Sequence, residues 1–149
     1  MPKDVSVSLN WMDRVDLEEV IFGKVTCPQL YNKDYIFYMF HYWAKPLYIG
    51  QTRLSSSLGK RIKKHHALPK IAFKYPGRAI KATCAKIDYC NLNRRTKKLV
   101  NTIEKVLIYR YRPEFNISAK KNFVFKYRTM KIRNYGDFYP LNKYITYNC

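Results

Sequence analysis

The chain has 149 residues, enough for one domain and too few for two ordinary ones. Apolar residues make up 47% and charged residues 26%, which permits a packed core and argues against global disorder. Lysine and arginine total 29 against 10 aspartate and glutamate residues, which gives a formal net charge of +19. So much positive charge on a small domain predicts a polyanionic partner, usually nucleic acid or an anionic membrane face.

The sequence also argues against a membrane-spanning or secreted protein. No apolar run approaches the ~20 residues of a membrane span, and the segment from Met1 to Asp4 lacks the apolar stretch of a secretory signal. We therefore expect a cytoplasmic, nucleoid-associated protein with no membrane partner. The four cysteines form no CxxC pair and the three histidines do not lie at zinc-finger spacing, so we expect reduced, structural thiols.

Charge divides the single domain into three parts. Residues 1–34 carry six acidic and four basic side chains and are expected to form an acidic N-terminal arm. Residues 35–118 are expected to form the core, and from Tyr35 to Ile87 there are eleven Lys or Arg and no carboxylate. Residues 119–149 are a basic, aromatic C-terminal extension, suited either to contact DNA or to complete the core with one or two strands.

The scarcity of carboxylates narrows the kinds of metal chemistry. A phosphodiesterase that holds two metals about 4 Å apart uses several converging carboxylates, and this chain has few beyond residue 34. If the protein cleaves nucleic acid with a metal, we expect a site built on one carboxylate. A protein that only binds nucleic acid needs none, and that alternative stays open.

Patterning predicts the main elements in chain order. The first 34 residues are expected to contain one short helix, over 13–22. Two strands joined by a turn at Pro46 predict an antiparallel hairpin, and Ser55–Ser57 can cap a helix that ends before Pro69. Beyond the arm we expect strands over 35–43 and 47–51, a helix over 55–66, a strand over 79–90 and a helix over 94–111.

Five short motifs lie on these elements. The second hairpin strand reads Leu-Tyr-Ile-Gly-Gln-Thr over 47–52, and the first reads Tyr-Ile-Phe-Tyr-Met-Phe over 35–40. An Arg-x-x-x-His pattern follows at Arg61 and His65, then Glu104 on the long helix, then Pro-Glu-Phe-Asn at 113–116. In this order and spacing, residues 35–118 resemble the GIY-YIG endonuclease family. The sequence departs from the family pattern in lacking the first glycine and in the longer, thirteen-residue gap between Tyr48 and Arg61.

The resemblance implies a fold, a metal and a set of site residues. The fold would be α/β of the α+β type, with helices flanking a small, mainly antiparallel three-stranded sheet. Glu104 would hold one Mg²⁺, for which Mn²⁺ can substitute. Tyr48 and Tyr38 would orient or deprotonate the attacking water, with Phe37 as the alternative at the first motif position. The implied catalytic set is Tyr38, Tyr48, Arg61, His65, Glu104 and Asn116.

Further positions have supporting roles. Arg61 would bind the scissile phosphate, His65 would hydrogen-bond a tyrosine or a phosphate, and Asn116 would brace the site. His66 is the alternative to His65, and Gly50 is expected to be structural, permitting close approach of backbone or of a helix. The basic residues expected to contact DNA are Arg53, Lys60, Lys63, Lys64, Lys120 and Lys121.

We therefore expect a stand-alone, metal-dependent endonuclease that cuts double-stranded DNA with a single divalent ion. It would be a restriction-type enzyme or one from a phage or mobile element, and a homodimer is possible. The alternative is a catalytically inactive nucleic-acid-binding module on the same fold. Two other nuclease types fit less well, because Val106 stands where a PD-(D/E)xK site on Glu104 needs lysine, and because an HNH site at His65 and His66 lacks its later histidine.

Overall fold

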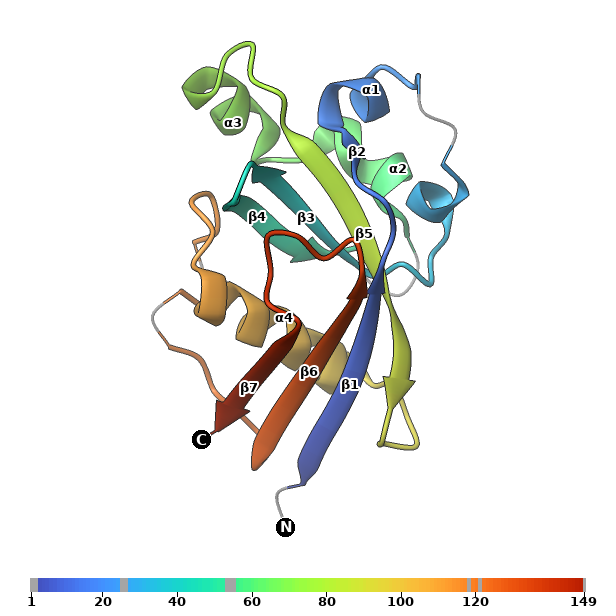
Figure 1. Cartoon of the computed structure of the whole chain (residues 1–149), viewed down its shortest axis with the longest axis vertical. Helices are drawn as coiled ribbons and strands as arrows, with labels where there is room; N and C mark the ends of the chain where they lie inside the picture. Colours follow the sequence, from blue (N-terminus) through green and yellow to red (C-terminus); the bar gives the residue numbers. More distant parts are fainter. Residues whose placement is uncertain (1–2, 25–26, 53–55, 118, 121, 149) are drawn as a thin grey trace.

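A computed structural model of the chain describes residues 3–24, 27–52, 56–117, 119–120 and 122–148. Across these residues the dominant feature is one mixed sheet of seven strands, which curls into a half-barrel (Figure 1). The strand order is β4-β3-β5-β1-β6-β7, and β2 pairs with β5. The strands are β1 (Asp4–Trp11), β2 (Val15–Asp16), β3 (Phe37–Tyr42), β4 (Lys45–Gln51), β5 (Lys81–Cys90), β6 (Thr129–Gly136) and β7 (Tyr144–Asn148).

The prediction of a small three-stranded sheet flanked by helices was wrong. The three expected strands do pair antiparallel, as β4, β3 and β5. The sheet continues past β5, however, because both ends of the chain supply further strands. β1 pairs antiparallel with β5 and parallel with β6, and β6 pairs antiparallel with β7.

The sequence of β1 explains why the first residues enter the sheet. Val5, Val7, Leu9 and Trp11 alternate with polar residues, and all four side chains are at most 2% exposed. A strict period of two places one face of a strand against the core. The N-terminal arm was predicted from its acidic residues, and most of these lie outside β1. The charge pattern therefore did not indicate the strand, which depends on the alternation of apolar and polar residues.

Short helices cover one end of the sheet. α1 (Leu17–Ile21) and the 3-10 helix η1 (Pro28–Tyr31) precede the hairpin. The helix expected over 55–66 is instead broken into α2 (Leu58–Arg61) and the 3-10 helix η2 (Ile62–Lys64). Pro69 does not end a helix but lies in the first turn of α3 (Leu68–Lys74). Backbone N–H groups in the first turn make no hydrogen bond within the helix, so a proline is tolerated there.

The long helix α4 (Lys97–Tyr111) covers the other half of the sheet. The side chain of Thr96 caps it by accepting a hydrogen bond from the Leu99 backbone N–H at 3.2 Å. Its buried side chains pack with those of β1 and β6 into one apolar cluster, while α1, α2 and α3 pack with β3 and β4 into a second. Alternate side chains of β3 and β5 enter the two clusters, so the clusters lie on opposite faces of these strands.

Candidate active site

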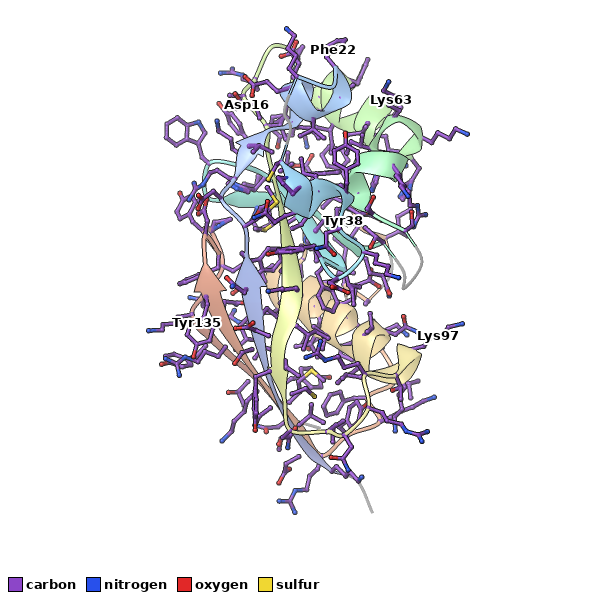
Figure 2. All side chains as sticks on the ribbon, turned by 90° about the vertical axis from the view of Figure 1, so that its right-hand side faces the viewer. Asp16, Phe22, Tyr38, Lys63, Lys97 and Tyr135 are labelled. Carbon is purple, nitrogen blue, oxygen red and sulfur yellow. The ribbon has the colours of Figure 1, made fainter. Side chains whose placement is uncertain are left out.

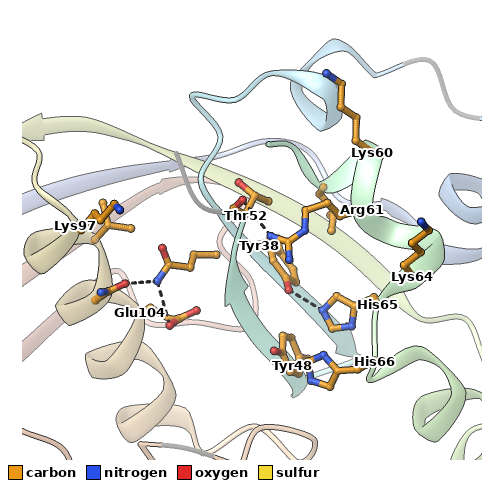
Figure 3. A pocket seen from close by; sticks show the side chains of 14 residues that line it. Tyr38, Tyr48, Thr52, Lys60, Arg61, Lys64, His65, His66, Lys97 and Glu104 are labelled. Carbon is orange, nitrogen blue, oxygen red and sulfur yellow. Dashed lines mark hydrogen bonds between the residues drawn. The ribbon is translucent and has the colours of Figure 1, made fainter. Parts of the chain in front are cut away.

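An open cavity of about 1230 Å³ lies between α2 and the N-terminal half of α4, with the β3–β4 hairpin at its base (Figure 3). Five of the six predicted catalytic residues line it: Tyr38, Tyr48, Arg61, His65 and Glu104. Four of them come from β3, β4, α2 and α4, His65 directly follows η2, and their positions lie up to 66 residues apart in sequence. The fold therefore brings the predicted set together, although the architecture around it differs from the expected one.

The two tyrosines lie on the same face of the hairpin. Tyr38 pairs with Gly50 and Phe40 pairs with Tyr48, so the two tyrosines are diagonal neighbours. Their rings stack with centroids 5.9 Å apart and an interplanar angle of 20°. Tyr38, rather than Phe37, faces the cavity, because Phe37 points to the opposite side of the strand and is fully buried in the other apolar cluster.

Gly50 provides the space for this arrangement. A β-carbon at Gly50 would lie 2.6 Å from the hydroxyl oxygen of Tyr38 and 2.8 Å from Cε1 of Tyr48. Both distances are far inside van der Waals contact. Only glycine lets the two rings approach the β4 backbone this closely, which agrees with the structural role expected for it.

His65 is held in one tautomer. Its Nδ1 accepts a hydrogen bond from the Ala67 backbone N–H at 3.1 Å, so the neutral ring carries its proton on Nε2. Nε2 lies 2.6 Å from the hydroxyl oxygen of Tyr38 and donates to it (Figure 3). Burial, with the nearby charges of His66 and Arg61, lowers the pKa of His65 to about 4. The ring is therefore neutral at physiological pH and acts as a donor to Tyr38.

The hydrogen bond that His65 donates to Tyr38 fixes the proton positions on the Tyr38 and Tyr48 hydroxyls. Since the Tyr38 oxygen accepts from His65, its own proton is available to Tyr48, and a hydrogen bond between the two phenols lowers the pKa of Tyr48 and raises that of Tyr38. Burial is the main cause that raises the pKa of both residues, and the negative charge of Glu104 adds to it. Of the pair, Tyr48 is the phenol whose oxyanion receives a hydrogen bond from its neighbour.

Arg61 is positioned by the strand that precedes it. One of its terminal nitrogens donates to the backbone oxygen of Thr52 at 3.1 Å, which fixes the guanidinium at the cavity wall. Its positive charge lowers the pKa of both Tyr38 and Tyr48. A guanidinium held in this way can bind a phosphate through two parallel hydrogen bonds.

Glu104 lies on α4, across the cavity from Arg61. The side-chain amide of Gln51 donates to Oε1 of Glu104 at 3.3 Å and to Oδ1 of Asn101 at 2.6 Å (Figure 3). Among the described residues, no group of three His, Cys, Asp or Glu side chains could form a closed metal cage. One carboxylate with neighbouring amide oxygens suits Mg²⁺ instead, because this ion keeps several of its waters and binds through one or two carboxylates plus phosphates. The donor set therefore fits a single, water-rich ion.

Asn116 is the one predicted catalytic residue outside the cavity. Its side chain is 7% exposed, and it accepts from the Ile49 backbone N–H at 2.9 Å and donates to the Ile49 carbonyl at 2.8 Å. This pair of bonds ties the turn after α4 to β4, between Tyr48 and Gly50. Asn116 thus has the bracing position expected of it and has no direct access to a substrate.

The predicted DNA-binding residues divide into three groups. Lys60 and Lys64 line the cavity, whereas Lys63 does not. Lys120 lies elsewhere, where its ammonium donates to the backbone oxygen of Glu114 at 3.1 Å. The two remaining predicted contacts, Arg53 and Lys121, fall outside the described residues.

Further polar residues of the cavity lie outside the predicted catalytic set, and of these only His66 was named, as the alternative to His65. Asn101 and Lys97 lie on the same side of α4 as Glu104, one turn and two turns toward its N-terminus, but as single polar residues they resemble ordinary surface. Gln51 follows the Tyr-Ile-Gly motif directly, and His66 stacks on His65 with centroids 4.9 Å apart. With Lys97 included, four cationic side chains and one carboxylate line the cavity, which gives it a strongly positive field.

Comparison with known proteins adds nothing to this picture: no family model, curated protein or solved structure matches the chain. Within the described ranges, α4 is the longest helix, and none is both long and apolar enough to cross a membrane.

Proposed function

We propose that this protein is a metal-dependent DNA endonuclease that hydrolyses phosphodiester bonds with a single divalent ion, as the resemblance to GIY-YIG endonucleases implies. One observation carries the proposal. Tyr38, Tyr48, Arg61, His65 and Glu104, which lie far apart in sequence, line one open cavity. Packing accounts for the position of Tyr38, which is 6% exposed, but it gives no reason for Arg61 and Glu104 to face the same cavity.

The positive side chains account for substrate binding. Lys60, Lys64 and Lys97 surround the cavity and can neutralise backbone phosphates on either side of the scissile bond. Arg61, fixed by its hydrogen bond to Thr52, binds the scissile phosphate and stabilises the charge that develops on it.

The phenol pair accounts for activation of water. His65 donates to Tyr38, and Tyr38 in turn donates to Tyr48. Tyr48 must first release its own proton to solvent, and as the phenolate it then takes a proton from the attacking water. Because the charge of Glu104 is one cause of the raised pKa of Tyr48, neutralising that carboxylate favours the phenolate. Glu104, with Gln51 and Asn101 beside it, would hold the divalent ion. When bound there, the ion supplies Lewis acidity that stabilises the leaving oxygen.

Cleavage of supercoiled plasmid tests the proposal. Wild-type protein is incubated with plasmid in Mg²⁺ or in EDTA, beside Glu104→Gln and the matched exposed variant Glu18→Gln on α1. We expect Mg²⁺-dependent cleavage by wild type and by Glu18→Gln, and loss of cleavage with retained DNA binding in Glu104→Gln. An open-circular product indicates nicking by single chains, and a linear product indicates paired cuts, as expected of a homodimer.

Failure of the plasmid assay has a defined meaning. If the wild type binds plasmid and short duplexes tightly but cuts none of several modified and unmodified DNAs in Mg²⁺ or Mn²⁺, the proposal is wrong. The inactive nucleic-acid-binding module is then the function that the cationic cavity supports.

A further inference from the structure

The sheet has a second face, on the side opposite α4, formed by β5, β1, β6 and β7. In Figure 1, α4 lies behind these strands, and in Figure 2 Tyr135 and Lys97 project to opposite sides of the molecule. The short helices α1, α2 and α3 pack on this side at Ala82 and Cys84 of β5, and the described helices leave open the part formed by β1, β6, β7 and the C-terminal end of β5. We define the open sheet face by Ser6, Ser8, Tyr89, Arg133, Tyr135 and Tyr144.

The residues on this face differ from those of an ordinary packing surface. Along β1 and β6 the inward positions are buried, whereas the outward positions are polar or aromatic. Among the described residues, no outward position on β1, β6 or β7 carries an aliphatic side chain. A face that docks another protein through apolar burial would have such side chains at its centre. The outward positions carry Ser, Thr, Lys, Arg and Tyr instead, which argues for a polar, charged ligand.

Cross-strand pairing arranges aromatic and basic side chains in a row. Tyr89 pairs with Ser8, Ser8 with Arg133, and Arg133 with Tyr144, so one line crosses all four strands. The Tyr89 and Tyr144 side chains are 56% and 64% exposed, although exposed aromatic rings of this size are costly in water. The Arg133 guanidinium lies 4.6 Å from the ring centroid of Tyr135 and 5.5 Å from that of Tyr144.

The small residues of β1 leave a trough between larger neighbours. Ser8 and Asn10 form the floor of a hollow of about 520 Å³, with Asp88 and Tyr89 on one side and Arg133 and Tyr135 on the other. Asp88 is the one carboxylate among these lining residues. Three strand spacings separate Tyr89 from Tyr144, a distance of about 14 Å. This span accommodates a few unpaired bases, each with a flat face that can stack on a tyrosine ring or a guanidinium.

We propose that the open sheet face is a second nucleic-acid site, which binds single-stranded DNA or RNA. Bases stack on Tyr89, Tyr135 and Tyr144, while Arg133 and the adjacent Lys131 contact phosphates. A duplex keeps its base faces covered and would gain nothing from the exposed rings. None of the residues that line the cavity with Glu104 lines this hollow, and the proposal does not depend on the nuclease activity proposed above.

Fluorescence anisotropy with the full chain in EDTA tests this site without any cleavage. The probes are labelled oligothymidylate and oligouridylate of about twelve nucleotides and a duplex of about the same length. We expect the double variant Tyr89→Thr/Tyr144→Thr to bind both single strands at least about fivefold more weakly, and to bind the duplex within about twofold of wild type. Both replaced residues are mostly exposed and threonine favours strands, so the fold should persist, which an unchanged thermal melting profile verifies.

The matched control is Phe73→Ala, which removes a ring that is 90% exposed on α3, away from this face. It should leave all three affinities unchanged. Photo-crosslinking of a thiouridine-containing oligonucleotide provides a second measurement, with crosslinks expected in peptides that contain Tyr89, Tyr135 or Tyr144. Equal weakening of single-strand and duplex binding in the double variant would overturn the proposal, as would an unchanged single-strand affinity or crosslinks confined to the cavity. A preference for one of the two single strands would identify the sugar that the face recognises.

Discussion

The pair of hydrogen bonds between Asn116 and Ile49 gives the sharpest quantitative prediction. Replacing Asn116 with alanine leaves the Ile49 backbone N–H and carbonyl without their partners, in a place where Ile49 is fully buried and Asn116 is 7% exposed. An unsatisfied buried polar group costs ~1–3 kcal/mol, so two of them should lower the free energy of unfolding by about 2–6 kcal/mol.

Asn91 provides a matched control elsewhere in the same sheet. Its side chain accepts from the Ser6 backbone N–H at 2.9 Å and donates to the Asp4 carbonyl at 3.0 Å, the same pair of bonds at an exposed position. Water can replace both bonds there, so Asn91→Ala should cost about 1 kcal/mol or less. Urea denaturation followed by circular dichroism gives both values. If Asn116→Ala loses no more stability than Asn91→Ala, the bracing role assigned to Asn116 is wrong.

Three other predictions concern the cavity. Gly50→Ala should cost about 1–3 kcal/mol of stability by overpacking and should slow plasmid cleavage about a hundredfold, because the new β-carbon displaces Tyr38 by several tenths of an ångström from His65. In urea denaturation, the stability of wild type relative to His65→Gln should fall as the pH drops from 6.5 toward 4, since the unfolded chain protonates His65 in that window while the folded ring stays neutral. Lys60→Gln/Lys64→Gln should reduce the salt dependence of duplex binding, measured as the slope of log K against log salt, by about 2.

Each of these predictions has a control that separates it from a general effect. Gly77→Ala places a β-carbon in open space at a residue with φ +68°. The strained backbone should lower the free energy of unfolding by about 1 kcal/mol, and plasmid cleavage should not slow. Lys63→Gln should change the salt slope less than the double variant does, because Lys63 does not line the cavity. If the difference in the free energy of unfolding between wild type and His65→Gln stays constant from pH 6.5 to 4, the neutral state assigned to the folded His65 ring is wrong.

The residues of the candidate site were expected from the resemblance to a known family, and five of them line one cavity. Tyr48 and Glu104 lie on elements whose patterning is strong, a short β-rich strand and a long amphipathic helix. Patterning places these elements along the chain, but it does not show that the two side chains face a common space. Lys97 and Asn101 share the helix face of Glu104, but single polar residues near a helix N-terminus resemble ordinary surface, so nothing marked them in advance.

The extent of the sheet could not be predicted in the same way. β1 pairs in parallel with β6, whose first residue lies 125 positions after that of β1 in the chain. Such pairing depends on long-range register, which local composition does not encode. The alternation of Val5, Val7 and Leu9 is typical of a strand that was not predicted, and it does not specify the strand's neighbours. The broken helix at residues 58–64 is a similar case, because Pro69 is compatible both with ending one helix and with beginning the next.

The central claim is that Glu104 holds the single metal ion of a DNA-cleaving site. The most direct test is the initial rate of plasmid cleavage as a function of Mg²⁺ concentration, for wild type and for Glu104→Gln, with DNA affinity measured on the same samples. We predict a first-order dependence on Mg²⁺ for wild type and a rate at least about a hundredfold lower in Glu104→Gln, with DNA affinity unchanged within about twofold. Cleavage that is independent of Mg²⁺, or that proceeds equally fast in Glu104→Gln, would contradict the account.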